Sequence, residues 1–342
     1  MSLLDTYDYE LPKELIASTP AEPRDSAQLF VYNTKTDDVR FDYFYNLSAH
    51  LPEESLLVLN TTKVVPARVK LKKENGGMVE ILFLINEKTG DNVIPCLADR
   101  KLYVDSVLFF PNGKSVVVRK QTEERFFLEL QFPREDLPAL LEQYGTTPIP
   151  KYIKGNMLHE EVLRERYQTI FADVPLSVAA PTASLHFTER VFASLAEKHI
   201  SHVPVTMHVG LGTFAPVKDE NIAEKKLHNE WFEIPEESAK LIRVAKEHNH
   251  PVVTVGTTVV RTLESAARGM HGATDIFIFP PFEFKVPDAL ITNFHVPKSS
   301  LMMLVDAFLK DKNAKRGILD LYAIAIKEKF RFYSFGDAML IL

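Results

Sequence analysis

Histidines stand in apolar or turn-like segments at several places in this sequence, and imidazole is the side chain that titrates nearest to neutral pH. They are His186, His208, His228 and His295. Each can be interpreted as a hydrogen-bonded core residue or as a group that transfers protons. No pair has the spacing of a His-Glu-x-x-His zinc motif, so we expect no metal site.

Asp337 follows Gly336 within an aromatic and aliphatic run. A carboxylate in such surroundings could transfer protons if it were left unpaired. It could equally cap the turn that Gly336 predicts.

A strand, a glycine turn and a helix start are predicted around Gly256. Free backbone N–H groups and the positive end of the helix dipole make such a turn suitable for a carboxylate or phosphate. Thr257 and Thr258 could hydrogen-bond the same anion or could simply cap the helix. Arg261 could reach that anion or lie on the outer face of the helix.

Gly210 and Gly212 follow a second apolar strand that ends near His208. The segment lacks the third glycine of a dinucleotide-binding fingerprint, and Pro216 opposes a helix there. Two glycines still allow the backbone to approach a flat ligand closely. The alternative is a tight turn beside a buried structural histidine.

The elements that must position these groups fall into two kinds. Short strands separated by turn signals predict a small antiparallel barrel, and they cover 68–72, 78–85, 92–98, 106–110, 115–121 and 125–132. Elsewhere, apolar strands at 56–59, 203–209 and 251–255 run into polar or glycine turns and alternate with amphipathic helices. We therefore expect a mixed α/β (α+β) fold, in which an α/β catalytic domain of residues 1–64 and 148–342 carries an inserted barrel domain of residues 65–147.

A basic stretch begins just before the predicted barrel and consists of Lys63, Arg68, Lys70, Lys72 and Lys73. Basic strands can bind nucleic-acid phosphates, but lysines also protect exposed sheet edges from aggregation. The residues alone leave both interpretations open.

Composition sets limits on the cellular setting. The 342 residues are 46% hydrophobic with a net charge of -6, and Cys96 is the only cysteine. The sequence begins without a secretory signal pattern and has no apolar run of membrane-spanning length. We therefore expect a cytoplasmic protein without disulfides, and one that makes any nucleic-acid contact through a local patch.

Taken together, the motifs resemble the S-adenosylmethionine:tRNA ribosyltransferase-isomerases of queuosine synthesis over nearly the whole chain. The segments that carry this likeness are Leu11–Ala17 with Arg24 and Asp25, Val65–Arg68, Arg166–Thr169, Ala179–Thr182, His208–Phe214, Val255–Thr258, Thr292–His295 and Phe335–Ala338.

The resemblance implies that S-adenosylmethionine is a ribosyl-donor substrate and that no cofactor is permanently bound. The acceptor would be 7-aminomethyl-7-deazaguanine at the tRNA wobble position, and the products epoxyqueuosine, adenine and methionine. His186 and His208 are then the candidates for proton transfer, with Asp337 and Glu230 in reserve. The substrate would be bound by Asn60, Thr182, Gly210, Gly212, Gly256, Thr257, Thr258, Arg261, Asn293 and His295. The basic stretch would contact tRNA, and we expect a monomer.

Two alternatives to this function stay open, and departures from the family pattern motivate the first of them. Lys63, Ser184 and Lys225 stand where the family usually has Arg, Gly and His. One alternative is a divergent relative that uses S-adenosylmethionine with another acceptor. The other is a tRNA-binding protein that has lost turnover, against which the motif histidines and Asp337 argue.

Overall fold

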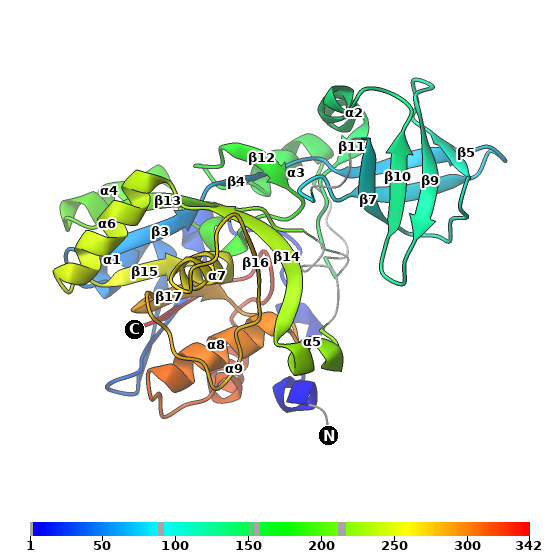
Figure 1. The fold of residues 1–342 in the computed structure, drawn as a ribbon. Coiled ribbons are helices and arrows are strands. Elements are labelled where there is room, and N and C mark those ends of the chain that lie inside the picture. Colours follow the sequence, from blue (N-terminus) through cyan, green and yellow to red (C-terminus); the bar gives the residue numbers. More distant parts are fainter. Residues whose placement is uncertain (1–2, 88–91, 151, 154–157, 211–216) are drawn as a thin grey trace.

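The computed structural model describes residues 3–87, 92–150, 152–153, 158–210 and 217–342. Its strands form two main sheets: a large one that carries most of the helices, and a compact barrel to one side of it (Figure 1). The small strand pair β4 (Thr62–Val64) and β12 (Val174–Ser177) lies between the two bodies.

The large sheet is mixed, with a parallel centre. Within the described residues its order is β16 (Ala273–Ile276), β14 (Lys226–Glu233), β13 (Ser201–Met207), β3 (Leu56–Asn60), β15 (Val252–Val255), β17 (Ala289–Asn293), β18 (Ala338–Ile341), β1 (Gln28–Asn33) and β2 (Asp38–Tyr43). The strands from β13 to β17 pair in parallel. Every residue of β3, β15 and β17 is buried, as expected for parallel strands covered on both faces.

Helices cover both faces of this sheet because alternate strand residues point to opposite sides. On one face Val191 of α4 packs in a cluster with Leu57. On the other, Ile242 of α6 packs in a cluster with Val58. The helices of this body are α1 (Leu47–His50), α4 (Glu189–Glu197), α5 (Asp219–Glu224), α6 (Glu236–Glu247), α7 (Thr257–Ala266), α8 (Ser300–Asp311) and α9 (Ile318–Lys327).

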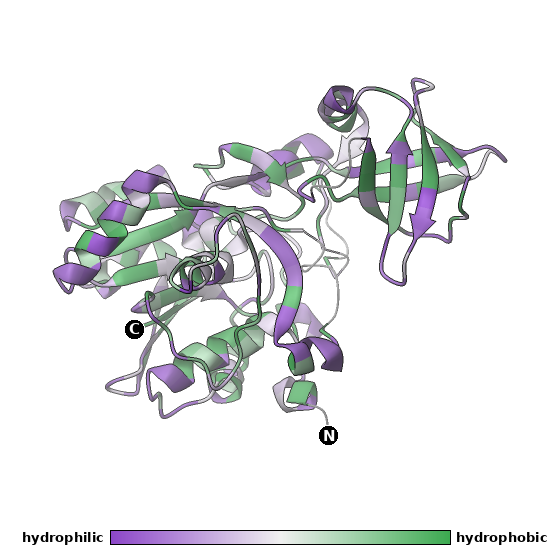
Figure 2. Ribbon diagram, in the orientation of Figure 1, coloured by the Kyte–Doolittle hydropathy of each residue, from purple (hydrophilic) through white to green (hydrophobic). Residues whose placement is uncertain are grey.

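Hydropathy follows this layering. Figure 2 shows hydrophobic strands at the centre of the large body and helices that are hydrophilic on their outer sides. Helix α8 is capped by Ser299, whose side chain accepts a hydrogen bond from the Met302 N–H at 3.3 Å.

The second body is a closed antiparallel barrel. Its strands, in order around the barrel, are β5 (Arg68–Lys73), β6 (Met78–Phe83), β7 (Val93–Ala98), β10 (Phe126–Leu130), β9 (Ser115–Gln121) and β8 (Val107–Phe109). Pairing of β8 with β5 closes the ring. The short strand β11 (Gly145–Thr146) pairs with β5, and helix α2 (Leu137–Tyr144) adds Leu137, Leu140 and Leu141 to the barrel core. The expected mixed α/β fold with an inserted barrel is thus confirmed.

Helix α3 (Glu160–Arg166) contacts both bodies, because its Leu163 packs in a cluster with Phe335 and its Arg164 bonds the end of α2. Arg164 donates to the Glu142 carboxylate at 2.6 Å and to the Gly145 carbonyl at 2.7 Å. It also pairs with Glu160 at 3.0 Å, whose carboxylate accepts the Thr147 N–H. The end of α2 is therefore held in place by charge-assisted hydrogen bonds.

The two chain connections between the bodies touch at Gly145. A Cβ atom on this residue would lie 1.8 Å from the Pro66 carbonyl oxygen and 2.4 Å from that of Leu141. Both neighbours are backbone atoms, so only glycine fits without a shift of one connection.

We predict that Gly145→Ala destabilises the fold by about 1–3 kcal/mol, since a methyl group forced against backbone strains a packed junction. Urea unfolding would measure this loss. Gly77→Ala is the matched control, because the nearest atom to its added Cβ is the movable Asn75 side-chain oxygen at 3.2 Å. Equal stability of the two variants would contradict the junction argument.

In the part of the chain that the structure describes, no helix combines the length and apolarity needed to cross a bilayer.

Candidate active site in the cleft between the two bodies

A cleft of about 740 Å³ opens between the barrel and the large body. Its lining is mostly apolar and comes from both bodies. The lining residues are Val65, Pro66, Ile85, Asn86, Ile94, Arg134, Leu137, Pro138, Leu141, Glu142, Pro175, Leu176, His208 and Trp231. Mainly apolar clefts with a few convergent polar groups are the usual form of small-molecule sites.

His208 is the sequence-predicted catalytic residue that reaches this cleft. Its Nδ1 lies 2.8 Å from the Thr62 hydroxyl, and its ring stacks on Trp231 with centroids 5.1 Å apart and planes 14° apart. Among the described residues, its buried Nε2 has no hydrogen-bond partner. The ring is thus fixed through one nitrogen, and the other is left to interact with a ligand.

Asn86 lines the cleft from the barrel side and carries a second unpaired polar atom. Its side chain is buried, and its Oδ1 lacks a partner among the described residues. Its Nδ2 lies 2.5 Å from the position that a Cβ on Gly210 would occupy. Gly210 therefore permits close approach of the two bodies next to His208.

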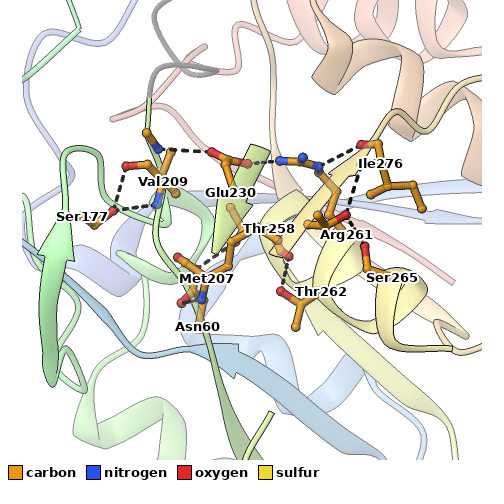
Figure 3. Close-up of polar contacts among 12 residues, drawn as sticks. Asn60, Ser177, Met207, Val209, Glu230, Thr258, Arg261, Thr262, Ser265 and Ile276 are labelled. Carbon is orange, nitrogen blue, oxygen red and sulfur yellow. Dashed lines mark hydrogen bonds and ion pairs between the residues drawn. The ribbon is translucent and has the colours of Figure 1, made fainter. Parts of the chain in front are cut away.

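Next to Gly210, Glu230 and Arg261 form a buried ion pair (Figure 3). The Glu230 carboxylate also accepts the Gly210 N–H at 3.2 Å, and Arg261 donates its Nε–H to the Ile276 carbonyl at 3.3 Å. Arg261 does not lie on the outer helix face. Its Nη2 is buried without a partner among the described residues, so one donor remains for an anion.

The turn at Gly256 has the predicted strand-to-helix geometry. Gly256 has φ +92° and precedes α7, and no side chain caps this helix. Thr258 instead accepts a hydrogen bond from Asn60 at 3.2 Å, and Thr257 is buried. The capping alternative for the two threonines is therefore wrong.

Both polar atoms of the Asn60 side chain form hydrogen bonds with neighbouring segments of the site (Figure 3). Its Oδ1 accepts the N–H groups of Thr62 and Met207, both at 3.1 Å. Its Nδ2 donates to the Met207 carbonyl at 3.0 Å as well as to Thr258. These bonds join β3, β4, β13 and α7 at one point.

A separate polar cluster surrounds His186. Thr182 donates to the Asn293 side-chain oxygen at 3.0 Å, and the Asn293 amide lies 3.5 Å from His186 Nε2. The His186 ring packs on Phe44 with centroids 5.1 Å apart. The Asn293 amide also donates to the Asp337 carbonyl at 3.4 Å.

Asp337 is paired and is not free in the way that proton transfer would require. Its carboxylate accepts the Arg331 N–H at 2.7 Å, the Arg331 Nη2–H at 2.9 Å and the Gln28 N–H at 3.1 Å. These contacts favour the turn-capping interpretation.

His295 lies apart from the cleft lining. Its Nε2 is 2.9 Å from the Thr292 hydroxyl, and its backbone N–H donates to Tyr322.

The basic stretch lies along β4 and β5. Lys63, Lys70 and Lys72 are exposed, whereas Arg68 is paired with Glu80 at 2.8 Å. Lys73 donates to the Lys101 carbonyl at 3.3 Å.

Local structure explains one of the unusual family positions, Ser184, and nothing in the structure explains the lysine at 225. Ser184 belongs to the 3-10 helix Thr182–Ser184 and has no positive φ, so a glycine is not required there. Lys225 ends α5 with φ +56°, a left-handed conformation. Gly212 lies outside the described residues.

Sequence reasoning missed Asn86, Thr62 and the ring of Trp231. Trp231 is the only tryptophan of the chain and follows Glu230 directly, which was a usable signal. Asn86 offered none, because only the folded barrel brings it beside Gly210. Among the described residues, no three potential metal ligands come together.

The fold and the cleft together define a class of mixed α/β enzymes in which an inserted barrel forms one wall of the site. A family model described as "Queuosine biosynthesis protein" matches residues 4–341. The chain therefore belongs to this family of queuosine biosynthesis enzymes.

Several relatives are similar to this chain over nearly its whole length. The S-adenosylmethionine:tRNA ribosyltransferase-isomerases of Thermosipho melanesiensis and of a Sulfurihydrogenibium species are 45% and 44% identical to this chain, each covering 99% of both proteins. The crystal structure of S-adenosylmethionine tRNA ribosyltransferase from Thermotoga maritima is similar with a TM-score of 0.54 and 33% identity, over 98% of this chain and 99% of that one.

Burial keeps the site histidines neutral at physiological pH. It lowers the pKa of His208 to about 4 and that of His295 to about 3. The pKa of His186 also falls to about 3, mainly through burial and further through the positive charge of Arg331.

We predict that acid destabilises the fold partly through these histidines. Below pH 6.5 the unfolded chain protonates them and the folded chain does not, so stability falls by about 1.4 kcal/mol per pH unit for each residue. His186→Gln should reduce the loss between pH 7 and 5 by about 2 kcal/mol in urea unfolding. The exposed His271→Gln is the control, and an unchanged loss for His186→Gln would contradict the assignment.

Proposed function

We propose that this enzyme transfers and isomerises the ribosyl group of S-adenosylmethionine onto 7-aminomethyl-7-deazaguanine at the tRNA wobble position. The products are epoxyqueuosine in tRNA, adenine and methionine. S-adenosylmethionine acts as a substrate, and no permanently bound cofactor takes part.

One observation carries this proposal: relatives that bear the ribosyltransferase-isomerase name match the chain end to end at 44–45% identity. The interdomain cleft supports it, since an apolar cleft with few polar groups suits the flat rings of donor and acceptor.

His208 is our first candidate for proton transfer. The sulfonium makes hydrogens on the neighbouring ribose carbon acidic, and removal of one leaves its electron pair on that carbon. A neutral imidazole with a free Nε2 can accept this proton when the tautomer places N–H at Nδ1, toward Thr62. The resulting imidazolium can return a proton to the departing adenine.

The other candidates receive supporting roles. The unpaired Nη2 of Arg261 and the start of α7, with Gly256, Thr257 and Thr258, would bind the methionine carboxylate. Glu230 positions Arg261 through their ion pair. His186, Thr182 and Asn293 form a second polar group that we assign to ribose or base contacts. His295 is bonded to Thr292, and Asn60 would position Thr258 at the start of α7.

The proposal also covers the location, oligomeric state and domain organisation of the protein. We propose a cytoplasmic monomer with a catalytic domain of residues 1–64 and 148–342 and a barrel domain of residues 65–147. Lys63, Lys70, Lys72 and Lys73, with Arg68 beside them, face the tRNA backbone.

The reaction is tested with S-adenosylmethionine and tRNA that carries the modified base. We expect adenine release together with a mass gain on tRNA, and His208→Gln should lower kcat by about 100-fold or more. His271→Gln serves as the exposed control. Adenine release without tRNA modification would show that the ribosyl group goes to another acceptor. RNA binding without turnover would show that the protein binds tRNA but is not an enzyme.

The tRNA face is tested with Lys70→Ala and Lys72→Ala, whose side chains point outward from β5. Each change should weaken tRNA binding. It should also reduce the slope of log Kd against the logarithm of the salt concentration by roughly 0.7–0.9. Lys240→Ala on α6 removes the same charge elsewhere and should leave binding unchanged. Equal effects of all three changes would show that the β5 surface with Lys70 and Lys72 is not the tRNA-binding surface.

A further inference from the structure

We propose that the cleft binds an aminated purine-type ring, with the Asn86 side-chain oxygen accepting a hydrogen bond from the exocyclic amino group. The inference rests on the proposed function and extends it, because it assigns a recognition residue to the barrel. Two substrates of the reaction contain such a ring: adenine in S-adenosylmethionine and the deazaguanine in tRNA.

The first support is the unpaired state of Asn86. Its side chain is buried and lines the cleft, and its Oδ1 has no partner among the described residues. A buried amide oxygen without a donor carries an uncompensated desolvation penalty. A ligand N–H group would remove this penalty, whereas a carbonyl or ether oxygen would not.

The second support is the position of Asn86 beside the aromatic pair. Its amide lies against Gly210, two residues after His208, so the barrel and the large body meet at this point. His208 and Trp231 stack there and both line the cleft. The unpaired Nε2 of His208 is a second polar atom for a ring that carries nitrogens.

The third support is the character of the remaining wall. Ile85, Ile94, Leu137 and Leu141 face the same cavity with apolar surface. A planar heterocycle buries its faces against such a wall and satisfies its edge groups at a few fixed points.

Trp231 provides a direct test, because it is the only tryptophan of the chain and its emission reports on this cleft. Fluorescence titrations of the full-length enzyme would compare two matched pairs of probes. Adenosine against purine riboside tests the adenine amino group, and guanosine against inosine tests the amino group of a guanine-type ring.

We expect the aminated member of one pair to bind at least about tenfold more tightly than its partner. The pair that shows this difference identifies the source of the ring. Asn86→Leu should abolish the discrimination, and Asn86→Asp, which keeps an acceptor oxygen, should retain it. Asn112→Leu changes an exposed turn residue of the same barrel and should behave as the unaltered enzyme.

Discrimination that survives in Asn86→Leu, or its absence in both pairs for the unaltered enzyme, would overturn the inference. The experiment can refute the Asn86 recognition site and the proposed reaction independently of each other. Turnover on tRNA with intact discrimination in Asn86→Leu would refute the site alone, whereas amino-dependent binding without turnover would refute the reaction alone.

Discussion

The candidate site depends on a buried carboxylate that has to be neutralised. Glu230 on β14 would be strongly destabilising without partners, and it finds them in Arg261 of α7 and in the Gly210 N–H. This contact fixes the distances between β14, α7 and the residues that follow β13. Removing one partner of such a pair leaves an uncompensated buried charge, so loss of either Glu230 or Arg261 would be strongly destabilising.

The second condition for the site is close approach of the two bodies. Gly145 lets the two connections between barrel and large sheet touch, and Gly210 gives room to Asn86 at the cleft. Arg164 then holds the end of α2 through two carbonyl groups and a carboxylate. The barrel is therefore one wall of the cleft and supplies Asn86, Ile85 and Ile94 to it.

The motif histidines divide into different roles once their partners are known. His208 lines the cleft with one nitrogen unpaired, whereas His186 lies in a separate cluster with Asn293, and His295 is bonded to Thr292. Burial lowers the pKa of all three, so each is neutral at physiological pH. Only the free Nε2 of His208 combines this neutrality with a place in the cleft.

The sequence by itself determined the barrel strands, the strand–turn–helix around Gly256 and the family, because periodicity, turn residues and motif order are local properties of the chain. Tertiary structure alone decided which polar atoms are left unpaired. Asp337 is paired with Arg331 and Arg261 with Glu230, while Asn86 Oδ1 and His208 Nε2 are left without partners in the part of the chain that the structure describes. Hydrogen-bond partners come from segments far apart in the chain, so only the folded molecule shows which groups remain free to bind a substrate.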